Sequence, residues 1–253
     1  MKITKNELKK MINESVERQL RKTIHQRNNH KRKVNEQFNT KYEYFPKNND
    51  ELEQIIHQQI KKYGANCNLN MIDTSRIKDM SYLFFDLKFN GDISEWDVSN
   101  VTNMSMMFYQ SNFNGDISKW NVGNVKNMHG MFHNSKFNKN ISKWNVSNVI
   151  TMRALFNSSK FNQNISNWNV SKVADMHAMF AFSYFNQDIS KWNISKVTDM
   201  SFMFKDSDFN QNISKWFNKL KSKINLENFG IFNKIKIDSY DDFENYYRTV
   251  NKF

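Results

Sequence analysis

Histidines supply the first candidates for chemistry in this chain. His129 and His133 are four residues apart, so a helical turn would place both imidazoles on one face, at a spacing that can hold a metal ion. The segment "HGMFH" that contains them lacks the glutamate of the zinc-protease pattern. The spacing alone is therefore a weak indication of a metal site.

Other residue types with catalytic potential are sparse. Cys67 is the single cysteine, so no intrachain disulfide can form, and a lone cysteine is typical of an inert buried side chain. The sequence contains no phosphate-binding G-x-x-x-x-G-K-[ST] loop and no G-x-S-x-G nucleophile motif. We therefore predict no enzyme, no catalytic residue, no cofactor and no metal site.

The elements that position these residues repeat with a fixed period. Five nearly complete units of 24 residues run from Phe89 to Asp208, preceded by a degenerate unit and followed by the truncated unit "FNQNISKW" at 209–216. Each unit follows the pattern F-N-x-[D/N]-I-S-x-W-[N/D]-V-S-x-V-x-x-M-x-x-M-F. All six tryptophans fall 24 residues apart: Trp96, Trp120, Trp144, Trp168, Trp192 and Trp216.

Two apolar periods occur within each unit. "ISKWNV" alternates apolar and polar residues and predicts a short strand, whereas "VTNMSMMF" at 101–108 places apolar residues on one face of a short helical turn. The predicted fold is an α/β solenoid of leucine-rich-repeat-like coils, each a short parallel strand plus a short helical turn. We expect the tryptophans to form an internal column, and the asparagines that recur at Asn90 and every 24 residues after it to hydrogen-bond along the stack.

The same columns weaken the metal hypotheses. The columns of His129 and His133 hold Ser, Arg, Tyr, Asn, Ala or Lys in other units, which is typical of a solvated face. His177 shares the column of His129 two coils later, at roughly 10 Å if adjacent coils have strand spacing, too far for shared ligation. One column mixes Asp92, Asp116 and Asp188 with asparagines, so a calcium-binding repeat is not expected.

The repeat resembles the BspA-like leucine-rich-repeat family, in the branch found in bacterial surface proteins and lipoproteins. "FNGDISEWDVSNVTNMSMMF" at 89–108 and its successors carry this resemblance, which covers roughly 69–216. It implies a macromolecule-binding or adhesive solenoid without enzymatic chemistry, located at a cell surface. The chain has no signal-peptide pattern, no lipid-attachment cysteine and no transmembrane run, which instead suggests a cytoplasmic or particle-associated protein.

The ends of the chain do not repeat. We divide the sequence into a basic N-terminal helix and linker at 1–47, a capping helix at 48–64, the repeats at 65–216 and a C-terminal cap at 217–253. The first helix has an apolar stripe from Leu8 to Ile24, so it needs a partner and could oligomerise. Helices at about 49–62 and 238–250 are predicted to cover the two ends of the solenoid.

Positive charge is concentrated near the N-terminus. Of the net charge of +12, residues 1–64 contribute +7, from 15 Lys/Arg and 8 Asp/Glu. The acid-free run "RKTIHQRNNHKRK" at 21–33 could contact phosphates or an anionic surface, although it lacks the interleaved aromatics of a single-strand platform. The candidate contact residues are Arg21, Lys22, Arg27, Lys31, Arg32 and Lys33.

The exposed strand face is the predicted binding surface, because repeat proteins bind through extended surfaces. Three functions stay open: protein–protein interaction through this face, a structural or adhesive surface or particle component, and a nucleic-acid-associated protein that uses residues 21–33. An equally simple alternative is that the lysines keep the face soluble. The candidate partner-binding residues are Lys119, Lys143, Lys191 and Lys215 with Asn121, Asn145, Asn169 and Asn193.

Overall fold

The computed structural model describes residue 26 and residues 41–217. The chain forms two compact units, one made of 1–45 with 71–73 and the other of 46–70 with 74–253. In the first unit, a parallel bridge joins Tyr44 to Ile72, and the backbone N–H of Asp73 donates to the carbonyl of Tyr44 at 2.8 Å. The predicted first helix, the C-terminal cap and the candidate contacts Arg21, Lys22, Arg27, Lys31, Arg32 and Lys33 lie outside the described residues.

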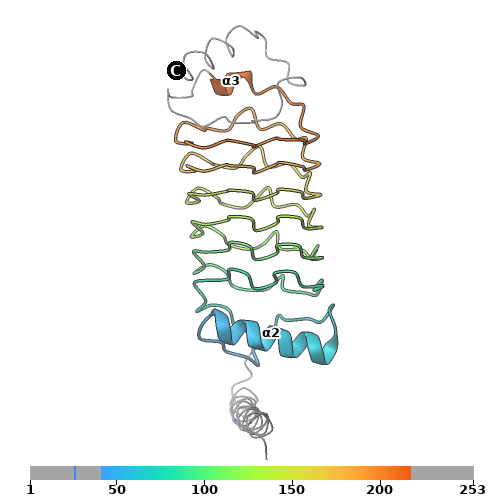
Figure 1. Ribbon diagram of the computed structural model, residues 1–253. Helices are drawn as coiled ribbons and strands as arrows, with labels where there is room; N and C mark the ends of the chain where they lie inside the picture. Colours follow the sequence, from blue (N-terminus) through green and yellow to red (C-terminus); the bar gives the residue numbers. More distant parts are fainter. Residues whose placement is uncertain (1–25, 27–40, 218–253) are drawn as a thin grey trace, which may run out of the picture. The chain divides into compact units, whose positions relative to one another are not determined.

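Helix α2 spans Asn49–Tyr63 and begins the second unit. The side chain of Asn48 accepts the N–H of Glu51, and Gly64 ends the helix with a φ of 88°. The Nδ2 of Asn49 donates to the carbonyl of Ser81 at 3.1 Å. Helix α2 thereby contacts the edge of the first repeat, and Figure 1 shows it next to that repeat; a second short helix, α3, spans Ser214–Phe217.

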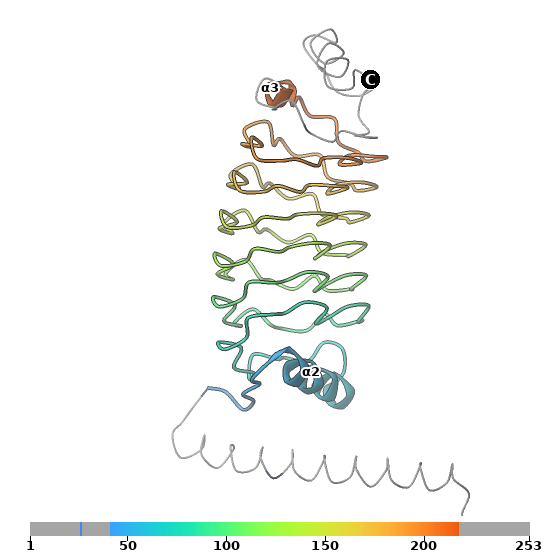
Figure 2. The same ribbon diagram turned by 60° about the vertical axis from the view of Figure 1, so that its left-hand side comes forward.

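Successive 24-residue units, called coils below, lie one after another in the second unit (Figures 1 and 2). Parallel bridges connect equivalent residues of neighbouring coils, from Asp79 to Asn103 and onward in steps of 24 to Asp199. The N–H groups of Met104 and Met106 donate to carbonyls of the following coil at 2.9 and 2.8 Å. Alternate N–H groups, such as that of Met107, instead bond three residues back within their own coil. We call this segment, 103–110 and its equivalents, the turn ladder.

The turn ladder corrects the predicted placement of the strand and the helical turn. Met106 and Gln110 have positive φ angles of 56° and 53°, and equivalent residues in every coil do the same, which interrupts any helix over 101–108. The segment "ISEW" forms a tight turn instead of a strand, in which the N–H of Trp96 donates to the carbonyl of Ile93. No ladder of backbone hydrogen bonds links this segment to neighbouring coils. The Ile, Trp and Val side chains of this turn point inward, while the residues between them are more exposed. The resulting alternation of apolar and polar residues resembles the two-residue period of a strand.

The core consists of aromatic and apolar columns in 24-residue register. The six tryptophans are at most 4% exposed, which confirms the predicted internal column. Five of them donate the indole N–H to the carbonyl 27 residues earlier; for Trp144 the acceptor is Ile117, at 3.0 Å. The recurrent asparagines also stack as predicted, since the N–H of Asn114 and of each later one donates to the Oδ1 of its counterpart in the preceding coil.

Positive φ in the turn ladder leads to a stability prediction. Ala154 has a φ of 50°, a conformation that glycine adopts without the steric penalty of a Cβ. Ala174 does not have a positive φ and serves as the control. We expect Ala154→Gly to raise the free energy of unfolding by about 1 kcal/mol and Ala174→Gly to lower it by about 0.5–1 kcal/mol. Urea denaturation of both variants measures the difference. Destabilisation of equal size at both positions would contradict the backbone assignment.

Candidate functional site

The predicted lysine column is exposed along its full length. Lys119, Lys143, Lys191 and Lys215 occupy equivalent positions, and Asn167 fills the same position in the coil between Lys143 and Lys191. Two carboxylates lie close to this column: Lys119 helps to lower the pKa of Asp116, and Lys191 does so for Asp188, after the larger effect of the N–H groups of Ser118 and Ser190. The column is therefore a solvent-facing line of charge with acidic neighbours at two coils.

The neighbouring asparagines are also exposed, but they serve the fold. The Oδ1 of Asn121 accepts the N–H of Gly123, and those of Asn145, Asn169 and Asn193 accept the N–H of the serine two residues on. These bonds are Asx turns, which need only a side-chain acceptor. Asp97 makes the same bond in an earlier coil. The side-chain oxygens of the four asparagines are thus engaged in hydrogen bonds within the turns. Among the predicted partner-binding residues, the lysines are therefore the groups most accessible to a partner.

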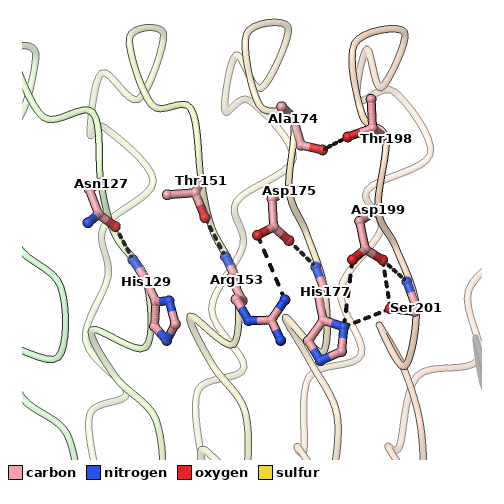
Figure 3. A network of polar contacts seen from close by, with 10 residues as sticks. All are labelled: Asn127, His129, Thr151, Arg153, Ala174, Asp175, His177, Thr198, Asp199 and Ser201. Atoms are coloured by element: carbon pink, nitrogen blue, oxygen red, sulfur yellow. Dashed lines mark hydrogen bonds and ion pairs between the residues drawn. The ribbon is translucent and has the colours of Figure 1, made fainter. Parts of the chain in front are cut away.

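A polar network connects three neighbouring coils on the turn ladder (Figure 3). Arg153 extends toward Asp175, with 3.9 Å between its Nη1 and the carboxylate Oδ2. In the next coil the Nδ1 of His177 lies 2.7 Å from the Oγ of Ser201 and 3.9 Å from Asp199. The ion pair between Arg153 and Asp175 and the hydrogen bond between His177 and Ser201 therefore connect neighbouring coils on this face.

His177, Asp199 and Ser201 have the residue types of a nucleophilic triad but not its geometry. A triad needs the serine on one imidazole nitrogen and the carboxylate on the other. Here both approach Nδ1, and the hydroxyl of Ser201 donates to Asp199 at 2.6 Å. Ser201 is also buried. The three residues can order the turn ladder but cannot activate the serine toward a substrate.

His129 and His133 do not form the metal site that a helical spacing would allow. Gly130, between them, has a φ of 57°, so the segment is not helical. The ring of His133 stacks on Tyr109 with centroids 4.6 Å apart. Within the described residues, no group of three or more His, Cys, Asp or Glu side chains could hold a metal ion.

Burial lowers the pKa of both His129 and His133. Positive charge on Arg153 and His177 lowers the pKa of His129 further, and positive charge on His129 does the same for His133. A base whose folded pKa is depressed is protonated more readily in the unfolded chain, so stability falls as the pH drops below about 6.5. We expect a lower Tm at pH 5.5 than at pH 7.5. The double variant His129→Ser and His133→Asn, which takes the residues of other coils, should reduce this difference; an unchanged difference would contradict it.

Exposed aromatic side chains on the turn ladder were not singled out from the sequence. Tyr82 and Phe182 are more than half exposed although both have positive φ, a conformation that disfavours large side chains. Tyr184 is exposed near Phe182, and the Nζ of Lys205 lies 6.0 Å from the Phe182 ring centroid. The signal in the sequence was the variation of these columns between coils, which sets them apart from the constant core columns.

The helices in the described part of the chain include none long and apolar enough to span a membrane.

Comparison with known proteins identifies a family. The family model described as a Mycoplasma protein of unknown function, DUF285, matches residues 51–160 and again residues 133–240. No curated protein and no solved structure matches the chain. The two overlapping matches together cover the coils described above, most of helix α2 and more than half of the chain. The chain therefore belongs to the DUF285 family of repeat proteins.

Proposed function

We propose that this repeat protein is a BspA-like solenoid of leucine-rich-repeat type that binds other macromolecules and catalyses no reaction. The exposed lysine column is its contact surface for a protein partner with acidic side chains. The observation that supports this most directly is the column itself: four lysines in 24-residue register, all solvent-facing. Neighbouring coils bring equivalent side chains to roughly 5 Å from each other, so an extended acidic segment can meet several lysines at once.

No catalytic arrangement of side chains is found among the described residues, which supports a binding role over catalysis. The best residue combination, His177 with Asp199 and Ser201, lacks the required geometry. Interior positions recur in every coil, while the solvent-facing columns vary, as expected when a common scaffold carries a specific surface.

Two other functions follow from specific observations. The resemblance to surface proteins favours a structural or adhesive component, which accessibility of the protein on intact cells to an added protease would test. The basic run at 21–33 favours association with nucleic acid. That function predicts a steep dependence of binding on salt that disappears when residues 1–47 are deleted.

Charge reversal tests the lysine column. We expect the triple variant Lys119→Glu, Lys143→Glu and Lys191→Glu to lose its protein partner, because the introduced glutamates repel an acidic surface. The measurement is quantitative capture from nuclease-treated lysate of the source organism. The control reverses three exposed lysines of other columns, Lys78, Lys88 and Lys196, and should retain the partner. A partner held equally by both variants would rule out the column.

A further inference from the structure

Charge in the described coils is separated along the stack. Residues 65–116 contain 3 Lys/Arg and 7 Asp/Glu, a net of −4. Residues 117–174 contain 8 Lys/Arg and no Asp or Glu at all, a net of +8. Residues 175–216 contain 4 and 5, a net of −1. The two central coils therefore form a basic band between two acidic segments, a pattern that the total charge of the repeats conceals.

The basic band is directed at solvent. Seven of its eight cationic side chains are exposed, and the eighth, Arg153, keeps 38% of its side-chain surface exposed beside Asp175. Lys172 donates to the Oδ1 of Asn148, which leaves its charge in place. The seven exposed lysines are Lys119, Lys126, Lys136, Lys139, Lys143, Lys160 and Lys172.

The lysines are spread around the coil rather than along one column. Lys136, Lys139 and Lys143 follow one another within a single coil, and Lys160 is the counterpart of Lys136 in the next coil. Lys126 precedes Lys136 by ten residues, which is almost half of a 24-residue coil. A ligand that meets many of these charges must therefore follow the curve of the coil.

We propose that the basic band binds a flexible polyanionic chain, of the class of carboxylated or sulfated polysaccharides. Duplex nucleic acid, with a persistence length of about 50 nm, is too stiff to follow one coil. Single-stranded nucleic acid is held largely by stacking on exposed aromatic rings. The large exposed apolar side chains of the described coils include only Ile150 within the band, while exposed aromatics such as Tyr82 and Tyr184 lie outside it.

This inference goes beyond the proposed protein contact, although the two surfaces share Lys119 and Lys143. Substitutions outside the shared residues separate them. The band variant carries Lys126→Gln, Lys136→Gln and Lys160→Gln, and the matched control carries Lys78→Gln, Lys88→Gln and Lys196→Gln, all at exposed positions. Both variants remove three charges, so net charge alone affects them equally.

The experiment titrates the full chain with heparin fragments and with polygalacturonate, and maps protected lysines by acetylation and mass spectrometry. We expect the band variant to bind roughly tenfold more weakly, with the control unchanged, because only the band variant loses positive charges that contact the polyanion. Protection should appear at Lys126, Lys136 and Lys160. Acetylation distinguishes each band lysine from those of the basic run at 21–33.

Three results would overturn the inference: equal weakening of both variants, protection confined to lysines outside the band, or tighter binding to single-stranded DNA of matched charge than to either polysaccharide. The last result would assign the band to nucleic acid. Each of them leaves the lysine column untouched, because capture of a protein partner depends on Lys191, which lies outside the band, as well as on the two shared lysines.

Discussion

Deletion of residues 141–164 is expected to leave a folded protein, whereas deletion of residues 141–152 is expected to unfold the repeats. The longer deletion removes one whole period, so Ile165 takes the place of Ile141 and every later column meets its counterpart. The shorter deletion shifts every later column by half a coil. Trp168 would then no longer meet a carbonyl at the position of Ile141, which accepts its indole N–H, and the aromatic stacks would end at the junction.

Circular dichroism and urea denaturation measure this contrast. The 24-residue deletion should show a cooperative transition at a lower midpoint, because one coil-to-coil interface is lost. The 12-residue deletion should show no such transition for the C-terminal coils. Equal stability of the two proteins would mean that the hydrogen bonds between equivalent residues do not determine the fold.

Truncation of a central tryptophan is the second large effect. Trp144 is 4% exposed, its ring lies 6.4 Å from that of Phe132, and its Nε1 donates to the carbonyl of Ile117. We expect Trp144→Ala to lower the free energy of unfolding by about 3–5 kcal/mol, through lost burial and the cavity left behind. Urea denaturation followed by circular dichroism measures the loss.

A second pair of variants isolates the indole hydrogen bond. Trp216 is fully buried, but its Nε1 has no hydrogen-bond partner among the described residues. Trp144→Phe removes side-chain volume and a hydrogen bond, whereas Trp216→Phe removes a similar volume but no hydrogen bond. We expect Trp144→Phe to be more destabilising by about 1 kcal/mol, the net value of one hydrogen bond. Equal losses would show that burial alone stabilises the tryptophan column.

Much of the interior could be predicted because the repeat gives each position several independent copies. Trp96 and its counterparts are tryptophan in every coil after the degenerate first one, which only a shared core position explains, and Asn90 begins a column whose stacking follows from its constant chemistry. The boundaries of helix α2 were also accessible, since Asn48 and Gly64 act through bonds to residues within four positions. Local hydrogen bonds and constant columns are encoded in short stretches of sequence.

The basic band shows how the same repeats concealed a surface. Residues 65–216 contain 15 Lys/Arg and 12 Asp/Glu, a nearly balanced total, yet Asp116 and Asp175 bracket 58 residues without an acid. The predicted lysine column includes Lys191 and Lys215, which lie outside the band, whereas the band crosses several columns. The positive charges combine into one surface only because successive coils are neighbours, which places Lys136 and Lys160 side by side.

The sequence by itself determined the 24-residue period, the core columns and the asparagine stack. Only the tertiary structure decided where the coils hydrogen-bond to each other. "ISKWNV" alternates as a strand would, but tight turns give the same alternation, and the bonds between coils lie instead at Met104 and Met106. The positive φ of Met106 is invisible in a residue type that rarely adopts it. Those bonds join residues 23 positions apart, and such partners are fixed only when the stacked coils bring them together.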